Sequence, residues 1–213
     1  MRVTPTRPSV ITDSYVPAAN RFFARSIFHA FVGLALAGPA AAASVVVKDA
    51  AGRPIKDAVL AVVGDAPGPT QVATASIEQS GRRFIPTVTV VPVGSSISFP
   101  NHDTVRHHVY SFSAAKRFEI KLYIGTPAAP VVFDQPGIVT LGCNIHDRML
   151  AWVVVVDSNV YAKTDGRGSA ELNVPDGTHR LRIWHPGLGE GVAPIETVVA
   201  MRAKQPTQIT LEP

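Results

Sequence analysis

Three side chains that bind soft metal ions stand close together in one short segment of the sequence. Cys143, His146 and Met149 follow one another at intervals of three residues and offer a thiolate, an imidazole and a thioether. A copper site of the trigonal His2Cys type with a weak axial Met uses these ligand types and one further histidine. The segment therefore predicts a redox copper site, provided that another part of the chain supplies that histidine.

Candidates for the missing histidine lie upstream, in the stretch 101–109. It contains His102, His107 and His108. In a strand, His107 and His108 would point to opposite faces, because side chains alternate along the backbone. Only one of these two neighbours can therefore face the Cys143 segment.

Cysteine usage also favours a metal site. Cys143 is the only cysteine among the 213 residues, so it cannot form an intramolecular disulfide. Secreted proteins ordinarily carry cysteines in even numbers for disulfides. A small buried hydrophobic role is the alternative for Cys143, and the nearby His146 and Met149 make it the weaker interpretation.

The segments that must position these residues read as short strands separated by turns. No stretch has a helical period, so the pattern predicts an all-β protein built as a sandwich. One strand ends just before Cys143, and a fully apolar strand follows Met149. The expected strands cover residues 44–48, 58–63, 87–92, 97–99, 107–112, 118–123, 130–133, 138–141, 151–156, 170–174, 179–184, 196–200 and 207–211.

Residues 1–43 have the pattern of a removable export signal. Arg21 and Arg25 precede an apolar run over 27–37, and a string of alanines over 40–43 follows. A helix that spans a bilayer needs about 20 apolar residues, and this run is shorter. We expect cleavage before Ser44 and a periplasmic or secreted protein with no membrane span in the mature chain. An uncleaved membrane anchor and a later translation start are the alternatives.

The charge balance excludes some partners. The formal charge is +4, but beyond residue 43 the chain has 16 Lys and Arg against 15 Asp and Glu. A nearly neutral mature chain gives no reason to propose binding to nucleic acid or to an anionic membrane surface. Five basic residues lie in the predicted copper domain, namely Arg82, Arg83, Lys116, Arg117 and Lys121. We interpret them as ordinary solvent-exposed charges. A docking site for an acidic partner protein is the alternative.

Residues 73–157 resemble a known family. A strand leads to Asn-x-Asp-x-x-x-His and a hairpin, and then come Phe-x-x-Pro-Gly, Cys-x-x-His-x-x-Met and an apolar strand. This order resembles the cupredoxins, among them the plastocyanin and amicyanin group, and looks most like cupredoxin-like proteins labelled as methylamine-utilisation proteins. The resemblance implies a cupredoxin-like Greek-key β-sandwich with one type 1 copper ion, held by His107, Cys143, His146 and Met149.

Two positions depart from the family's pattern. Counting from Asn101 favours His107 as the ligand, and the next position, usually an Asn that hydrogen-bonds the cysteine loop, is His108 here. The ligand loop carries Asp147 and Arg148, where amicyanin-like loops carry Pro and an apolar residue. A charged rim near His146 suggests a more polar docking surface for a redox partner.

The segments on either side of residues 73–157 resemble another fold. Residues 158–213 contain about four strand patterns, similar to carboxypeptidase-regulatory-like and transthyretin-like sandwich domains. The usual opening of those domains, a strand with Asp-x-x-Gly-x-Pro, lies instead at 47–54. We expect residues 44–72 and 158–213 to form one discontinuous small β-sandwich around the inserted copper domain. The rival arrangement pairs 44–63 only with the copper domain.

These features predict an exported type 1 (blue) copper protein that carries single electrons to or from a redox partner protein and works as a monomer. The alternative is a copper-binding or delivery protein, or a structural interaction protein, with the same fold and no redox partner. We expect no enzymatic activity. A zinc site has no use for Met149, no signature of a Cys-His nucleophile is visible, and a binuclear copper centre would need a second cysteine.

Overall fold

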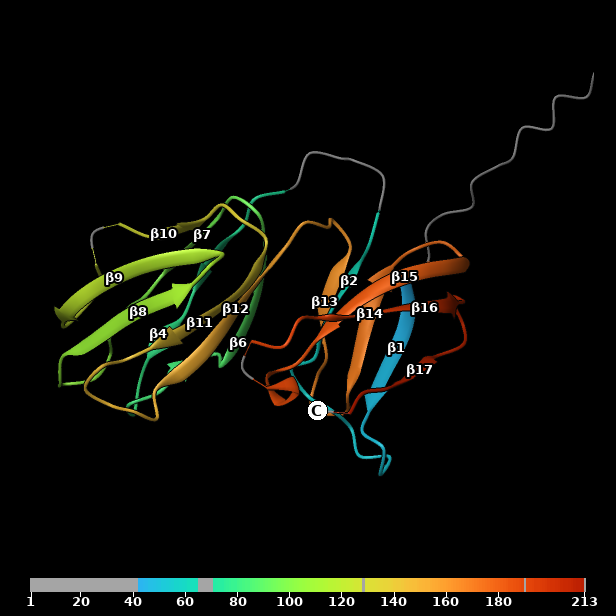
Figure 1. Cartoon of the computed structure of the whole chain (residues 1–213), viewed down its shortest axis with the longest axis horizontal. Coiled ribbons are helices and arrows are strands. Elements are labelled where there is room, and N and C mark those ends of the chain that lie inside the picture. Colours follow the sequence, from blue (N-terminus) through green and yellow to red (C-terminus); the bar gives the residue numbers. More distant parts are fainter. Residues whose placement is uncertain (1–41, 65–70, 128, 190, 213) are drawn as a thin grey trace, which may run out of the picture. The chain divides into compact units, whose positions relative to one another are not determined.

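The computed structural model of the chain describes residues 42–64, 71–127, 129–189 and 191–212. These residues form strands in five sheets, and their only helical segment is the 3-10 helix η1 (Pro186–Leu188) (Figure 1). The predicted all-β class is confirmed. The predicted export signal lies outside the described residues except for Ala42 and Ala43, which already belong to the first strand. Within the described ranges, no helix is long and apolar enough to cross a membrane.

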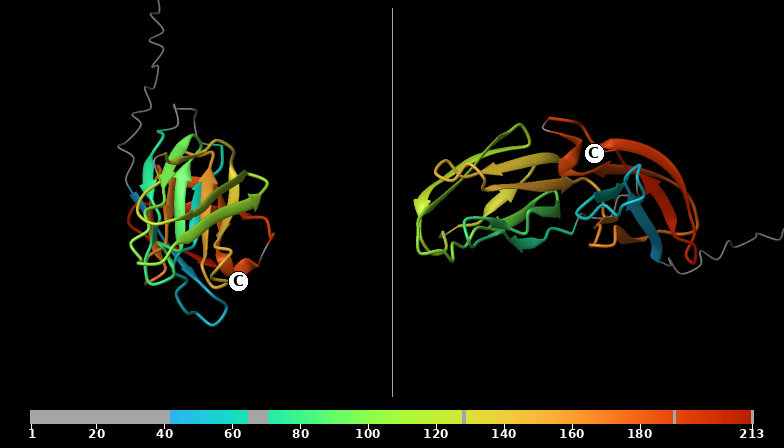
Figure 2. Two further views of the ribbon diagram at one scale, coloured as in Figure 1. Left: turned by 90° about the vertical axis from the view of Figure 1, so that its left-hand side faces the viewer. Right: turned by 90° about the horizontal axis from the view of Figure 1, so that it is seen from below.

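The middle of the chain forms a sandwich of a five-stranded and a three-stranded sheet, which we call the copper sandwich after the copper site that the sequence predicts. The five-stranded sheet has the order β6-β12-β11-β8-β9, and the three-stranded sheet has the order β10-β7-β3. A separate hairpin pairs β4 with β5. These strands are green to yellow in Figure 2, and their bounds are β3 (Thr74–Ser76), β4 (Glu78–Gln79), β5 (Phe84–Ile85), β6 (Val88–Pro92), β7 (Ser95–Ser98), β8 (His107–Ser113), β9 (Lys116–Tyr123), β10 (Val131–Phe133), β11 (Gly137–Gly142) and β12 (Leu150–Val156).

Strand β12 is apolar throughout because both of its faces are covered. Val153 and Val155 lie in the core of the copper sandwich. Val154 and Val156 point to the opposite face and belong to a separate buried cluster with Trp184. A strand buried on both faces shows a continuous apolar run and no alternation, which accounts for the sequence of β12.

The two flanking segments form a second sandwich from a three-stranded sheet, β14-β1-β17, and a four-stranded sheet, β13-β2-β15-β16. Its own core includes Val45, Leu60, Leu172 and Leu181. The bounds of its strands are β1 (Ala42–Lys48), β2 (Val59–Val62), β13 (Tyr161–Lys163), β14 (Ser169–Asn173), β15 (Gly177–Trp184), β16 (Ile195–Met201) and β17 (Thr207–Thr210).

Strands from the two ends of the described chain pair with each other in this second sandwich. β1 is antiparallel to β14 and parallel to β17. β2 is antiparallel to both β13 and β15. These pairings are the ones that insertion of the copper sandwich between the flanking segments requires, and the domain boundaries themselves stay a prediction.

Four short strands were not expected from the sequence, namely β3, β4, β5 and β13. Each has only two or three residues. Alternation of apolar and polar side chains needs about four residues to become visible, so strands this short are set by their neighbours in the sheet. The turn of the hairpin of β4 and β5 contacts Asp103 in the loop before β8.

Candidate metal centre

The strand order brings the two candidate ligand segments together. β8 begins at His107, and β11 ends at Gly142, directly before Cys143. Gly142 is the register partner of Tyr110, so the end of β11 lies beside β8. The loop 143–149 then returns to β12. Neighbouring strands therefore hold both ends of the ligand loop.

His107, Cys143 and His146 form one cluster at this end of the copper sandwich. Each offers one ligand atom, and the three atoms lie within 4.8 Å of one another. The Cys143 Sγ to His146 Nδ1 distance is 3.8 Å. The two imidazole rings meet edge to face, with centroids 4.9 Å apart. A thiol and two imidazoles thus converge on a volume that one metal ion could share.

Two of the three cluster residues are buried, and the third is partly exposed to solvent. His107 is fully buried and Cys143 is 3% exposed, whereas His146 is only half-buried. Met149 is 1% exposed and packs in the same core as Cys143, and its backbone N–H donates to the carbonyl of His146 over 2.9 Å. His146 therefore offers the one partly solvent-facing edge of the cluster.

The residues fit a copper ion by their chemistry. His107 Nδ1 is buried and has no hydrogen-bond partner among the described residues. A buried polar atom without a partner is costly, and a metal ion that binds there would remove that cost. One thiolate, two imidazoles and a nearby thioether match the donor set of a His2Cys copper site with a weak axial ligand.

The two other histidines of the upstream stretch are placed away from this cluster. His108 Nε2 contacts Glu119 Oε1 at 2.9 Å, and its ring packs against Tyr110. His102 is exposed, with Nε2 3.9 Å from Glu78. Of the three candidates, His107 alone joins Cys143 and His146. The assignment of all four predicted residues as copper ligands remains a proposal.

Asp103 contacts His107 and was not singled out from the sequence. Its Oδ2 lies 2.7 Å from His107 Nε2. The backbone N–H of Arg82 and then the hydrogen bond to His107 lower the pKa of Asp103 to about 2. The sequence did carry a signal, since Asp103 precedes His107 by four residues within Asn-x-Asp-x-x-x-His.

A polar network fixes the loop before His107. The Asn101 side-chain amide donates to the carbonyls of Val105 and Tyr123, both over 2.9 Å. The Tyr123 hydroxyl donates to the Phe99 carbonyl over 2.6 Å and accepts from Gln79. Burial raises the pKa of Tyr123 to about 12, and the nearby Cys143 adds to this rise. Tyr123 therefore stays a neutral hydrogen-bonding group.

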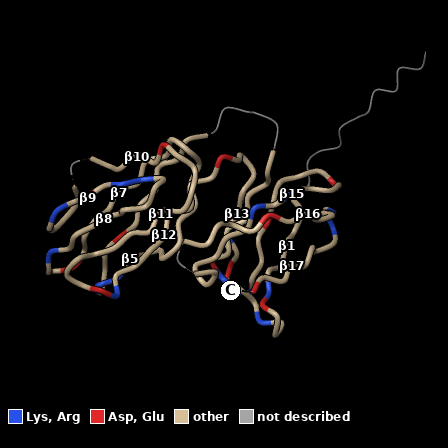
Figure 3. Tube along the Cα trace, viewed as in Figure 1, with Lys and Arg blue, Asp and Glu red and all other residues tan. Residues whose placement is uncertain are grey.

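Exposed charged residues stand in the segments that carry or contact the cluster residues. Four of these exposed residues are Arg82, Arg106, Asp147 and Arg148. Figure 3 shows Lys and Arg segments around the ends of β8 and β9. Asp147 and Arg148, which follow His146 in the ligand loop, are exposed, and the charged rim around His146 stays a prediction.

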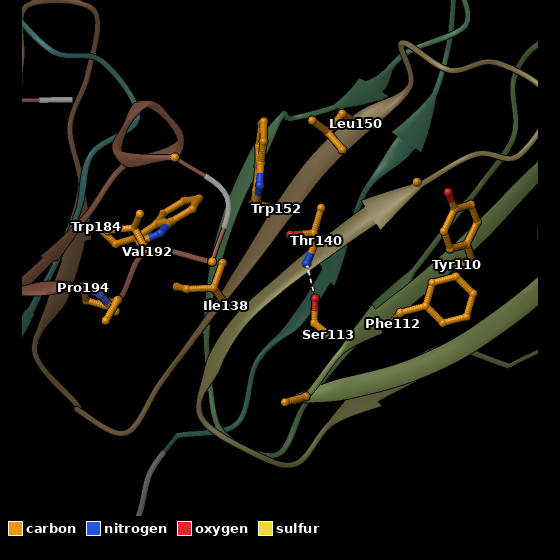
Figure 4. Close-up of a pocket in the computed structure, with 15 residues that line it drawn as sticks. Tyr110, Phe112, Ser113, Ile138, Thr140, Leu150, Trp152, Trp184, Val192 and Pro194 are labelled. Carbon is orange, nitrogen blue, oxygen red and sulfur yellow. Dashed lines mark hydrogen bonds between the residues drawn. The ribbon is translucent and has the colours of Figure 1, made fainter.

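A separate hollow lies on the outer face of the five-stranded sheet. It has a volume of about 620 Å³ and is lined on one side by Tyr110, Phe112 and Trp152 and on another by Trp184 and Val192 (Figure 4). It contains none of the four predicted ligands. The hollow is thus distinct from the metal cluster.

Comparisons with known proteins place cupredoxins among the similar structures. A purple cupredoxin from Nitrosopumilus maritimus matches 38% of this chain over 99% of its own length, with 21% identity and a TM-score of 0.34. A reduced Cu(I) form of an amicyanin variant matches 46% of this chain over 98% of its own, with 16% identity and a TM-score of 0.36.

A copper-containing nitrite reductase from Thermus scotoductus is also similar, over 45% of this chain and 24% of its own, with 24% identity and a TM-score of 0.36. No family model matches the sequence. No curated protein matches it either.

Proposed function

We propose that this protein is an exported type 1 copper protein that carries single electrons. Its copper ligands would be His107, Cys143 and His146, with Met149 as a weak axial ligand. The observation that carries the proposal is the convergence of three ligand atoms, one each from His107, Cys143 and His146, within 4.8 Å of one another. Export rests on the signal pattern of residues 1–43.

The chain's own residues suit electron transfer more than substrate chemistry. Copper, when bound, would supply the one-electron redox change. His107, Cys143 and Met149 are buried and sit at or between strand ends, so they would hold their positions in both oxidation states. The half-buried ring of His146 would be the contact through which a redox partner exchanges an electron.

The test is the visible absorption and electron paramagnetic resonance spectrum of the full chain, expressed with its own leader and loaded with one equivalent of Cu(II). We expect an intense thiolate-to-copper band and narrow copper hyperfine splitting. Cys143→Ser should lose both features. A pale spectrum that Cys143→Ser leaves unchanged would contradict the proposed site.

The alternative is copper binding or delivery without electron transfer. Both functions would give the same blue spectrum, so a second measurement separates them. An electron carrier should be reduced and reoxidised reversibly without losing its copper. A delivery protein should instead release Cu(I) to a competing chelator upon reduction, because transfer of the metal is then its function.

A further inference from the structure

One carboxylate connects the candidate ligand His107 to a hairpin turn more than twenty residues earlier in the sequence. Asp103 Oδ2 lies 2.7 Å from His107 Nε2. The same carboxylate accepts the backbone N–H of Gly81 at Oδ1 over 2.7 Å and that of Arg82 at Oδ2 over 2.9 Å. Both oxygens of Asp103 are therefore held by the turn between β4 and β5.

The turn has the backbone geometry needed to present these two donors. Gly81 and Arg82 have φ values of +59° and +57°. Positive φ at both central residues is the mark of the type I′ hairpin turn. A non-glycine residue such as Arg82 adopts this conformation only where its surroundings hold it. Here the hydrogen bond from its N–H to Asp103 is one such contact.

A hydrogen bond of the Asp103 backbone also holds this residue in place. Its N–H donates to Asn101 Oδ1 over 2.9 Å. Asn101 is itself buried and tied to Val105 and Tyr123. The carboxylate therefore has little freedom to leave His107, whether or not a metal ion is present.

The ionised carboxylate decides which nitrogen of His107 carries the proton. Both oxygens of Asp103 accept backbone N–H groups, and a carboxylate, which is ionised at neutral pH, offers acceptors only. His107 Nε2 must then be the protonated nitrogen. Nδ1 keeps its lone pair, and it is a buried atom without a hydrogen-bond partner among the described residues.

We propose that Asp103, held by the Gly81–Arg82 turn, is a positioning residue that orients His107 as a ligand and lowers the midpoint potential of the bound copper. This inference rests on the proposed function. A carboxylate that accepts the far N–H of a ligating imidazole makes that imidazole a stronger donor. A stronger nitrogen donor stabilises Cu(II) relative to the softer Cu(I). The turn thereby acts on copper through two hydrogen bonds.

The test compares Asp103→Asn with Asp147→Asn in the full copper-loaded chain. Both variants remove one negative charge near the cluster, but Asp147 is an exposed residue of the ligand loop, whereas Asp103 contacts His107 Nε2 directly. Loss of such a supporting partner typically costs 10–100-fold in metal affinity. If Cu(II) binding weakens tenfold more than Cu(I) binding, the potential of Asp103→Asn rises by about 59 mV. A shift no larger than that of Asp147→Asn would overturn the proposal.

A third variant tests the role of the turn. Arg82→Gly keeps the N–H and suits the positive φ, so it should not reproduce the rise in midpoint potential expected for Asp103→Asn. It retains the donor to Asp103 while removing the Arg82 side chain. A rise equal to that of Asp103→Asn would mean that the Arg82 side chain, and not the backbone clamp, sets the potential.

A measurement on metal-free protein separates this inference from the proposed function. Nitrogen-15 NMR of the apo chain should show His107 as the Nε2–H tautomer, and Asp103→Asn should lose that fixed tautomer. An Nδ1–H tautomer in the wild type would contradict the orienting role. Absence of a thiolate-to-copper band in the wild type would contradict the copper proposal and, with it, the effect on the potential, but not the orienting of His107, since the tautomer is read without metal.

Discussion

At the scale of single residues, the side chains of the candidate centre differ in their burial and in their hydrogen-bond partners. His107 is buried with one nitrogen bonded to Asp103 and the other without a partner. Cys143 is nearly buried beside it, and His146 reaches partly to solvent. Met149 is buried and contributes only a weakly coordinating thioether. Its expected effect is on the redox potential more than on copper retention.

We predict that Met149→Leu keeps the intense thiolate band but raises the midpoint potential. Loss of a weak donor destabilises Cu(II) more than Cu(I), and a tenfold difference corresponds to about 59 mV. The swap conserves volume and should cost less than about 1.5 kcal/mol of stability. The control is Met201→Leu, equally buried in the other sandwich, which should leave the potential unchanged. Equal potentials in wild type and Met149→Leu would rule out axial ligation by Met149.

At the scale of elements, the second sandwich depends on a close approach at the start of β14. Gly168 has a φ of +73°, and its carbonyl accepts the N–H of Val47 in β1 over 2.8 Å. A Cβ at Gly168 would lie 2.4 Å from the Val47 carbonyl oxygen. Only glycine allows β1 and this turn to approach so closely. The contact joins the two ends of the described chain.

Gly168→Ala should therefore lower the free energy of unfolding by about 2 kcal/mol or more, because it combines a steric clash with an unfavourable φ. Gly166→Ala is the matched control two residues away, since nothing lies within 4 Å of its added Cβ. It should stay within about 0.5 kcal/mol of wild type. Chemical denaturation followed by circular dichroism measures both. Equal stabilities would show that β1 does not need this approach.

At the scale of the whole described chain, a small buried cluster links the two sandwiches. Trp184 is 3% exposed and packs with Val88, Val154 and Val156 of the copper sandwich. Its ring lies 6.2 Å from that of Trp152. Lys163 Nζ also donates to the Val88 carbonyl over 2.6 Å. These contacts are fewer than those within either core, so the link is the weaker part of the structure.

Trp184→Ala should lower the free energy of unfolding by about 3–5 kcal/mol, the usual cost of truncating a buried aromatic residue. We expect the unfolding of the two sandwiches to separate, so that the copper absorption band and far-ultraviolet circular dichroism report different midpoints. Phe112→Ala is the control, because Phe112 lies in β8 of the five-stranded sheet, is 76% exposed and should change stability little. A single unchanged midpoint in Trp184→Ala would contradict the linking role.

The local sequence determined the strands and the ligand loop, because both depend on short-range patterns. The spacing of Cys143, His146 and Met149 places three donors on one loop, and alternation or continuous apolar runs mark strands such as β8 and β12. These signals need no knowledge of distant neighbours. The all-β class and the resemblance to cupredoxins followed from them.

Tertiary structure alone decided which residues complete the site. Whether His107 or His108 joins Cys143 depends on how β8 lies beside β11 and on the irregular pairing of β8 with β9. The partner of His107 Nε2 is Asp103, and the carboxylate of Asp103 is held by the turn between β4 and β5. These two strands have two residues each, which is too short to show a sequence pattern. The pairing of β1 with β17 joins residues more than 150 positions apart. Contacts between distant segments come from packing, and no local pattern contains them.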